Sequence, residues 1–365
     1  MKSLKLIILS AVLFAFASCD KVSFTGILIG NTSVDDRVEM SYGYLTALQE
    51  YHRHYRLEVA EDDGSYTYLV GSDSHMIDDP GRIIEMMDTM LAANDKFCAH
   101  LGDVVDTKPE YYAILKGVMD EYKERYYKKY CNYELINGDD GGRYWVEKTE
   151  DGQYIPLDYD TQSTMMFPLY ACVGNHDLTH NGWTLFADIF HTSFFQTMVL
   201  LPVTAEEQAQ GIIRADRHIF LDSANGTLGQ YQAKLISKDE DALVGLIEEE
   251  YGYKITFRNT FVYTHSNIFR PTSDEFASTY AREELYFLLD TFKRWDVNTV
   301  FLGHVHAWDE RYFGGVHYVT LDAMSERNSP DPGEYLVRVH VGSAQDDVKI
   351  SRVKMNYVSP KHKKK

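Results

Sequence analysis

Short apolar runs rich in β-branched and aromatic residues recur along the chain from about residue 66, with longer amphipathic stretches between them. Period-two or continuous apolar runs predict strands over Tyr66–Gly71, Lys96–Leu101, Phe167–Val173, His218–Asp222, Thr260–Thr264, Asn298–Leu302, Val316–Leu321, Glu334–Val341 and Val348–Met355. Apolar residues three and four positions apart predict helices over Gly81–Asn94, Glu110–Lys129, Gly229–Tyr251 and Glu283–Trp295. This alternation predicts an α/β fold in which helices pack over sheets.

The flanking segments suggest how the chain is organised. Ser33–Glu58 is amphipathic and predicts one helix in a lead-in of residues 19–63. No repeat or Pro/Ser-rich linker divides residues 64–356, so we expect one domain there. Within it, residues 131–162 are rich in Gly, Asp and Tyr and lack apolar periodicity, which predicts an irregular insertion. A basic tail, residues 357–365, ends the chain.

The first 18 residues have the pattern of an export signal. Lys2 and Lys5 precede the apolar run Leu6–Ala17, which is too short to span a bilayer as a helix. Small residues then lead to Cys19, as at a bacterial lipoprotein cleavage site. We therefore expect an exported protein held to a membrane by lipid on Cys19, without a spanning helix. Cleavage directly after Ala17, which would leave a soluble exported protein, is the alternative.

Composition excludes several classes. Hydrophobic residues make up 44% of the 365, which excludes wholesale disorder. The 55 Asp+Glu against 36 Lys+Arg give a formal charge of −19, which argues against a nucleic-acid groove because a phosphate backbone would be repelled. A small phosphate ester stays possible, since bound cations reverse a local field. The four cysteines form no Cys-x-x-Cys pair, so neither a thiol redox motif nor a zinc knuckle is expected.

Polar side chains suited to metal binding follow five of the predicted strands. Because open α/β sheets bind ligands at the carboxyl ends of their strands, we expect these side chains to converge. No single block is specific, and the argument lies in their order. The blocks are Ser72-Asp73-Ser74-His75, Gly102-Asp103-Val104-Val105-Asp106, Gly174-Asn175-His176-Asp177, His265 and Gly303-His304-Val305-His306.

These five blocks resemble the ordered signature of the calcineurin-like metallophosphoesterase superfamily: Asp-x-His, Gly-Asp-x-x-Asp, Gly-Asn-His-Asp/Glu, His and Gly-His-x-His. The resemblance extends over about Tyr66–Met355. It implies a four-layer α/β/β/α sandwich with a dinuclear metal centre between the sheets.

The resemblance also implies which residues hold the metals. One ion would take Asp73, His75 and His306, the other Asn175, His265 and His304, and Asp103 would bridge the two. Imidazoles and oxygen ligands without thiolate suit Mn, Fe, Zn, Co or Ni.

The implied reaction is hydrolysis of a small phosphate mono- or diester. A hydroxide bridging the ions would attack phosphorus, His176 would protonate the leaving group as general acid, and Asp106 would orient His176. Arg270 and His180 are weaker candidates for substrate contacts. The alternative is a cell-surface binding protein on the same fold, with catalysis lost or incidental. The sequence leaves the physiological substrate and the oligomeric state open.

Overall fold

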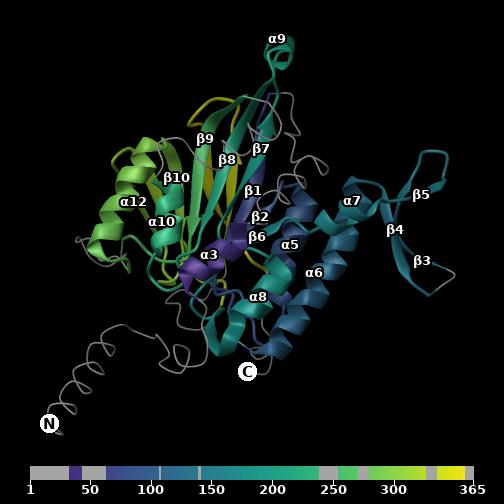
Figure 1. The fold of residues 1–365 in the computed structure, drawn as a ribbon, viewed down its shortest axis with the longest axis horizontal. Coiled ribbons are helices and arrows are strands. Elements are labelled where there is room, and N and C mark those ends of the chain that lie inside the picture. Colours follow the sequence, from purple (N-terminus) through teal and green to yellow (C-terminus); the bar gives the residue numbers. More distant parts are fainter. Residues whose placement is uncertain are drawn as a thin grey trace, which may run out of the picture.

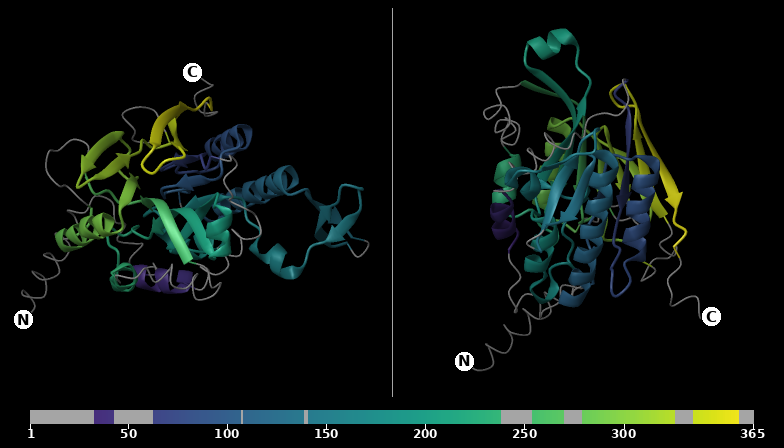
Figure 2. Two further views of the ribbon diagram at one scale, coloured as in Figure 1. Left: turned by 90° about the horizontal axis from the view of Figure 1, so that it is seen from above. Right: turned by 90° about the vertical axis from the view of Figure 1, so that its right-hand side faces the viewer.

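In the computed structural model, residues 33–42, 63–106, 108–138, 141–237, 254–269, 279–325 and 335–357 are described. Two large β-sheets lie face to face, and helices cover the outer face of each, as Figure 1 and Figure 2 show. The architecture is therefore a four-layer α/β/β/α sandwich, which confirms the predicted fold class.

The first sheet has five strands in the order β14-β13-β1-β2-β6. Strands β1, β2 and β6 are parallel, and β13 and β14 are added at one edge in antiparallel pairing. Helices α5 and α6 cover its outer face (Figure 2). The bounds are β1 Tyr66–Gly71, β2 Cys98–His100, β6 Leu169–Ala171, β13 Tyr335–Val341, β14 Val348–Lys354, α5 Gly81–Ala93 and α6 Pro109–Tyr130.

The second sheet has six strands in the order β11-β12-β10-β9-β8-β7. Strands β8, β9, β10 and β12 are parallel, and the edge strands β7 and β11 are antiparallel to their neighbours. Helices α3, α10 and α12 lie on its outer side (Figure 1, Figure 2). The bounds are β7 Phe195–Leu201, β8 Ile212–Leu221, β9 Lys254–Thr264, β10 Val297–Leu302, β11 Asp309–Phe313, β12 Val316–Thr320, α3 Val34–Tyr42, α10 Gln230–Ile236 and α12 Arg282–Arg294.

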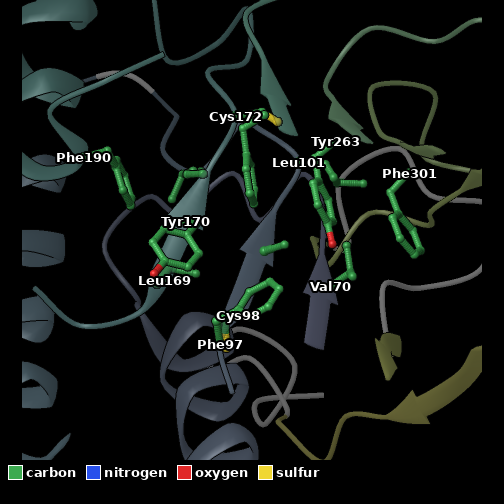
Figure 3. Packing of buried hydrophobic residues seen from close by; sticks show 14 of the residues in the cluster. Val70, Phe97, Cys98, Leu101, Leu169, Tyr170, Cys172, Phe190, Tyr263 and Phe301 are labelled. Carbon is green, nitrogen blue, oxygen red and sulfur yellow. The ribbon is translucent and has the colours of Figure 1, made fainter. Parts of the chain in front are cut away.

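Aromatic side chains fill the space between the sheets. Tyr68 of β1 is fully buried, and its ring lies against Phe261 and Tyr263 of β9 and Phe301 of β10. Figure 3 shows part of this core, with Tyr263 and Phe301 among the labelled residues. Strands covered on both faces need near-continuous apolar sequence, which is why these strands were recognisable from the sequence.

The insertion predicted to be irregular is ordered, and that prediction is wrong. It forms a three-stranded antiparallel sheet of β3 (Tyr133–Asn137), β4 (Arg143–Lys148) and β5 (Tyr154–Pro156), followed by the short helix α7 (Tyr159–Thr164). This small sheet projects beside the end of α6 (Figure 1). Trp145 is buried with its ring against Tyr127 of α6. One covered face on a small sheet leaves most of its strand residues exposed or half-buried, so the apolar signal was weak.

Two edge strands, β7 and β11, were not predicted, and β8 is longer than expected. It begins at Ile212 rather than at the predicted His218. Asp216 interrupts the apolar pattern, but its charge is accommodated inside the strand because it forms a buried ion pair with Arg258 on neighbouring β9. The Asp216 carboxylate also accepts a hydrogen bond from the Arg258 Nε at 3.0 Å.

The predicted helices are found, with two differences in extent. Helix α10 occupies the start of the predicted Gly229–Tyr251, and α3 the start of Ser33–Glu58; residues 238–253 and 43–62 lie outside the described part. Among the described residues, the remaining helical elements are a 3-10 turn at Thr179–Asn181, α8 at Gly182–Phe190 and α9 at Ala205–Ala209. Across the described ranges, no helix combines the length and the apolarity that crossing a bilayer requires. In the same ranges the cysteines, Cys98, Cys131 and Cys172, are free thiols.

Candidate metal centre

The five polar blocks meet at one end of the sandwich. Parallel strands β1, β2 and β6 bring three blocks to one edge of the first sheet, and β9 and β10 bring two to the second. Hydrogen bonds join the two sets: the His304 backbone N–H donates to Asp73 Oδ2 at 3.0 Å, and His265 Nδ1 lies 2.9 Å from the Leu101 carbonyl oxygen. The convergence expected from the sequence therefore occurs across both sheets.

The first donor group consists of Asp73, His75 and His306. His306 Nε2 lies 3.1 Å from Asp73 Oδ1 and 3.3 Å from His75 Nε2, and His75 Nε2 lies 3.9 Å from Asp73 Oδ1. One donor atom from each residue falls within 4.8 Å of the others, a spacing that can surround one metal ion.

The second donor group adjoins the first through Asp103. Asp103 Oδ2 lies 3.7 Å from His75 Nε2 on one side and 3.6 Å from His265 Nε2 on the other. His265 Nε2 is 3.0 Å from Asn175 Oδ1, and the His304 ring is centred 5.0 Å from the His265 ring. Asp103 thus stands between two donor groups, as a bridging ligand would.

The four-layer α/β/β/α architecture is the one that the resemblance to calcineurin-like metallophosphoesterases implied. A scan against protein-family models and a search of the curated proteins give no match. Solved structures similar to it include GAP50, the anchor in the inner membrane complex of Plasmodium, at 13% identity over 80% of this chain and 90% of that one, with a TM-score of 0.44. A dimetal phosphatase from Danio rerio is 9% identical over 80% of this chain and 99% of that one, with a TM-score of 0.37. A putative 5'-nucleotidase from Staphylococcus aureus is 12% identical over 82% of this chain and 57% of that one, with a TM-score of 0.37.

Five residues of these donor groups have left-handed backbone conformations. The φ angles are 51° at Asp73, 42° at His75, 52° at Asp103, 71° at His304 and 55° at His306. Asp and His tolerate this region better than most residues with a Cβ, but each such residue still costs about 1–3 kcal/mol. Strain concentrated at one place indicates that these loops are shaped for the geometry of the side chains.

Gly102 allows the second and third blocks to approach each other. Its φ is +97°, and a Cβ there would lie 2.9 Å from both the Cα and the N of Gly174 and 2.8 Å from His265 Nδ1. Since real Cβ atoms do not approach backbone so closely, only glycine fits at this position.

The two central carboxylates lie in the interior of the protein. Asp73 is fully buried and Asp103 is 1% exposed. Within the described ranges, no lysine or arginine forms an ion pair with either. Burial and the neighbouring Asp73 raise the pKa of Asp103 well above its usual value. Burial also acts to raise the pKa of Asp73, but the hydrogen bond from His306 and the surrounding histidines lower it overall. A buried acidic pair of this kind fits divalent cations.

The histidines are held in the form that binds metals. Burial lowers the pKa of both His75 and His304 to about 3 and also lowers that of His265. These imidazoles are therefore neutral near pH 7, with a lone pair available. The donor set thus fits two divalent ions in both charge and ligand type.

His176 and Asp106 form a pair at the more exposed side of the centre. His176 Nδ1 lies 3.2 Å from Asp106 Oδ1, and the two side chains are 29% and 23% exposed. The hydrogen bond to Asp106 outweighs burial and raises the pKa of His176. The His176 ring is centred 4.6 Å from the His75 ring, so the pair borders the first donor group.

Asp177, which the sequence argument left without a role, fastens the loops together. Its buried carboxylate accepts hydrogen bonds from the N–H groups of Val104 at 3.3 Å, Val105 at 3.1 Å and Gly174 at 2.9 Å. Tyr112 of α6 also donates to it, at 3.4 Å. The only signal in the sequence was its place directly after His176, since three backbone donors leave no trace in residue identity.

The weaker substrate candidates, His180 and Arg270, stay predictions. His180 lies in the turn Thr179–Asn181 with a φ of 51° and is exposed, and among the described residues none hydrogen-bonds or ion-pairs with its side chain. Arg270 and Cys19 lie outside the described residues.

Proposed function

We propose that the protein is a metal-dependent phosphoesterase that hydrolyses phosphate mono- or diesters. The proposal is supported above all by the position of Asp103 between two donor groups that five separate strand-end loops supply. If these buried polar groups served only the fold and bound no metal, the carboxylates would be buried without a counter-charge, which would cost stability.

Two divalent ions of the Mn, Fe, Zn, Co or Ni type fit the site. Asp73, His75 and His306 would hold one, Asn175, His265 and His304 the other, with Asp103 shared. When bound, the ions would activate water and neutralise charge on the phosphate oxygens. Asn175 contributes an oxygen without adding a negative charge, so the centre keeps its attraction for an anionic ester.

His176 is proposed as the proton donor to the leaving group. Asp106 would accept a hydrogen bond from the Nδ1–H of His176, which fixes the orientation of the ring. The proton on Nε2 would then be the one transferred to the leaving oxygen. The raised pKa increases the protonated fraction near neutral pH. Asp106 acts through His176 and is therefore a positioning residue.

The test combines metal analysis with turnover. Purified full-length protein should contain or take up two equivalents of divalent metal, and should hydrolyse p-nitrophenyl phosphate, bis-p-nitrophenyl phosphate or both with added manganese. A chelator should abolish turnover, and Asp103→Asn should lower it by at least about 100-fold. Asp290→Asn, at an exposed position on α12, is the control and should change neither the metal content nor the turnover. Folded protein that binds no divalent metal and cleaves neither ester would refute the proposal.

We also propose that the protein is exported and anchored by lipid on Cys19, as the signal pattern indicates. Detergent phase partitioning and mass spectrometry of the mature N-terminus test this. The wild-type protein should fractionate with membranes and carry acyl mass on Cys19, and Cys19→Ser should not. Soluble mature protein beginning at Ser18 would establish cleavage after Ala17 instead.

A further inference from the structure

An arginine on the edge strand of the first sheet reaches across to the second. Arg352 lies in β14, and its guanidinium carbon is 4.0 Å from the ring centre of Tyr335 and 5.1 Å from that of Trp308. It also forms a close ion pair with Asp322, whose side chain is 6% exposed. In the second sheet, Trp308 comes just before β11 and Asp322 just after β12. Arg352 therefore connects the two sheets.

Asp322 opens a loop that holds the backbone of a metal-ligand residue. Two residues along, the Met324 N–H donates to the Ser72 carbonyl at 2.8 Å, and the Ser325 N–H donates to the Asp73 carbonyl at 3.2 Å. Met324 is fully buried against the end of β1, where a Cβ on Gly71 would lie 2.5 Å from the Met324 Sδ. The loop therefore fixes the peptide groups from which the Asp73 side chain extends.

Trp308 connects Arg352 to a second ligand of the same ion. It is two residues after His306, whose Nε2 lies 3.1 Å from Asp73 Oδ1. The planar guanidinium over its ring restrains the chain that leaves His306. Asp73 and His306 thus depend on two different loops, and Arg352 contacts both.

We propose that Arg352 is a positioning residue for the metal site of Asp73, His75 and His306. This inference rests on the proposed function only in that the site binds a divalent ion. Loss of the guanidinium would release both the loop of Asp322 and the loop of Trp308, so Asp73 and His306 would no longer be held in register. In the other donor group, Asn175 follows β6 and His265 follows β9, so they lie on neither of these loops, and this group should lose less affinity.

A matched control pair lies on the neighbouring strand. Arg338 of β13 is 28% exposed and pairs at 3.0 Å with the fully buried side chain of Asp95, an arrangement close to that of Arg352 and Asp322. Asp95 stands just after α5, and within the described ranges neither member of this pair bonds to a metal-centre residue. Arg338→Met therefore removes an equivalent ion pair from the same sheet without disturbing the loops of the centre.

The experiment uses full-length protein stripped of metal with a chelator and titrated with Mn²⁺ or Zn²⁺ by calorimetry. Arg352→Met should weaken binding of one of two metal equivalents by about 10- to 100-fold and the other much less, whereas Arg338→Met should weaken neither equivalent. In the metal-free protein, hydrogen exchange at the amides of Met324 and Ser325 should accelerate in Arg352→Met but not in Arg338→Met. Asp322→Asn, which breaks the same pair while keeping the side-chain shape, should reproduce both effects if Arg352→Met does not fold.

The outcomes separate this inference from the proposed function. Equal weakening of both equivalents, equal effects of the two arginine variants, or unchanged exchange at Met324 and Ser325 would overturn the role of Arg352 while leaving the phosphoesterase proposal intact. A wild-type protein that binds no metal would instead remove the proposed function, and the exchange measurement would still decide whether Arg352 holds the loop.

Discussion

A fully buried ion pair joins α3 to the second sheet, and we predict that breaking it destabilises the fold. Arg37 of α3 binds Asp222, directly after β8, through two hydrogen bonds of 2.8 and 2.9 Å, and Nη2 also donates to Asn225 at 2.8 Å. Both charged side chains have 0% exposure. Arg37→Met keeps much of the aliphatic volume but leaves both carboxylate oxygens of Asp222 buried without their donor.

The expected cost is about 3–5 kcal/mol, because an uncompensated buried charge is more harmful than the pair is helpful. Since each 1.4 kcal/mol is a tenfold change, the unfolding equilibrium should shift by roughly 100- to several-thousand-fold. The double variant Arg37→Met/Asp222→Leu removes both charges, and its stability should return to within about 1 kcal/mol of wild type or exceed it. Urea unfolding of chelator-treated protein, followed by far-UV circular dichroism, measures all three.

The comparison of single and double variants is what decides. Arg294→Met, which removes an exposed partner of Asp290 within α12, is the control and should cost well under 1 kcal/mol. A loss below about 1 kcal/mol in Arg37→Met, or a double variant no more stable than the single one, would show that the Asp222 carboxylate does not depend on Arg37 for its counter-charge. The assignment of this pair as a buried ionic contact would then be refuted.

Three further predictions concern the candidate site. His176→Ala should slow alkyl phosphate esters by about 100- to 10,000-fold in kcat but p-nitrophenyl esters much less, and equal losses would contradict its role as general acid. Gly102→Ala should cost at least about 2 kcal/mol in urea unfolding because its Cβ meets backbone at 2.9 Å, whereas Gly117→Ala on α6, where nothing lies within 4 Å, should be neutral or stabilising. Adding Mn²⁺ at 100 times its Kd to chelator-treated protein should stabilise it by about 2.7 kcal/mol, seen as a higher Tm, since Asp73 and Asp103 then gain a counter-charge; an unchanged Tm would argue against a bound cation.

Much of the fold was predictable because its central strands are covered on both faces. Runs such as those of β1 and β10 are almost wholly apolar and end abruptly in Gly, Asp or His, so a strand and the loop after it are marked together. Parallel pairing then places loops from distant parts of the sequence at one end. The sequence therefore predicted that Asp73, Asp103 and His265 would meet, although their roles as ligands stay predictions.

Elements with weaker apolar patterns were missed for the same reason. Strand β11 (DERYF) is a mostly polar edge strand, and β4 has only Trp145 and Val146 buried. The contacts that orient the site were equally hidden. Asp177 binds backbone N–H groups, and Arg352 stacks on rings far away in sequence, so neither interaction is written in local residue spacing. Such long-range tertiary contacts can be recognised only in the three-dimensional structure.

The docking of α3 has a consequence for where the protein works. Asp222, its buried partner, is next to Ser223, whose hydroxyl bonds to Thr264 and accepts from the N–H of Ser266, the two neighbours of His265. Helix α3 is thus connected to the loop of His265 through Asp222 and Ser223. The 14 residues from Asp20 to Ser33 reach at most about 50 Å when fully stretched. If Cys19 carries lipid, the start of α3 can lie no farther than that from the bilayer, and esters embedded in the membrane become substrates to assay first.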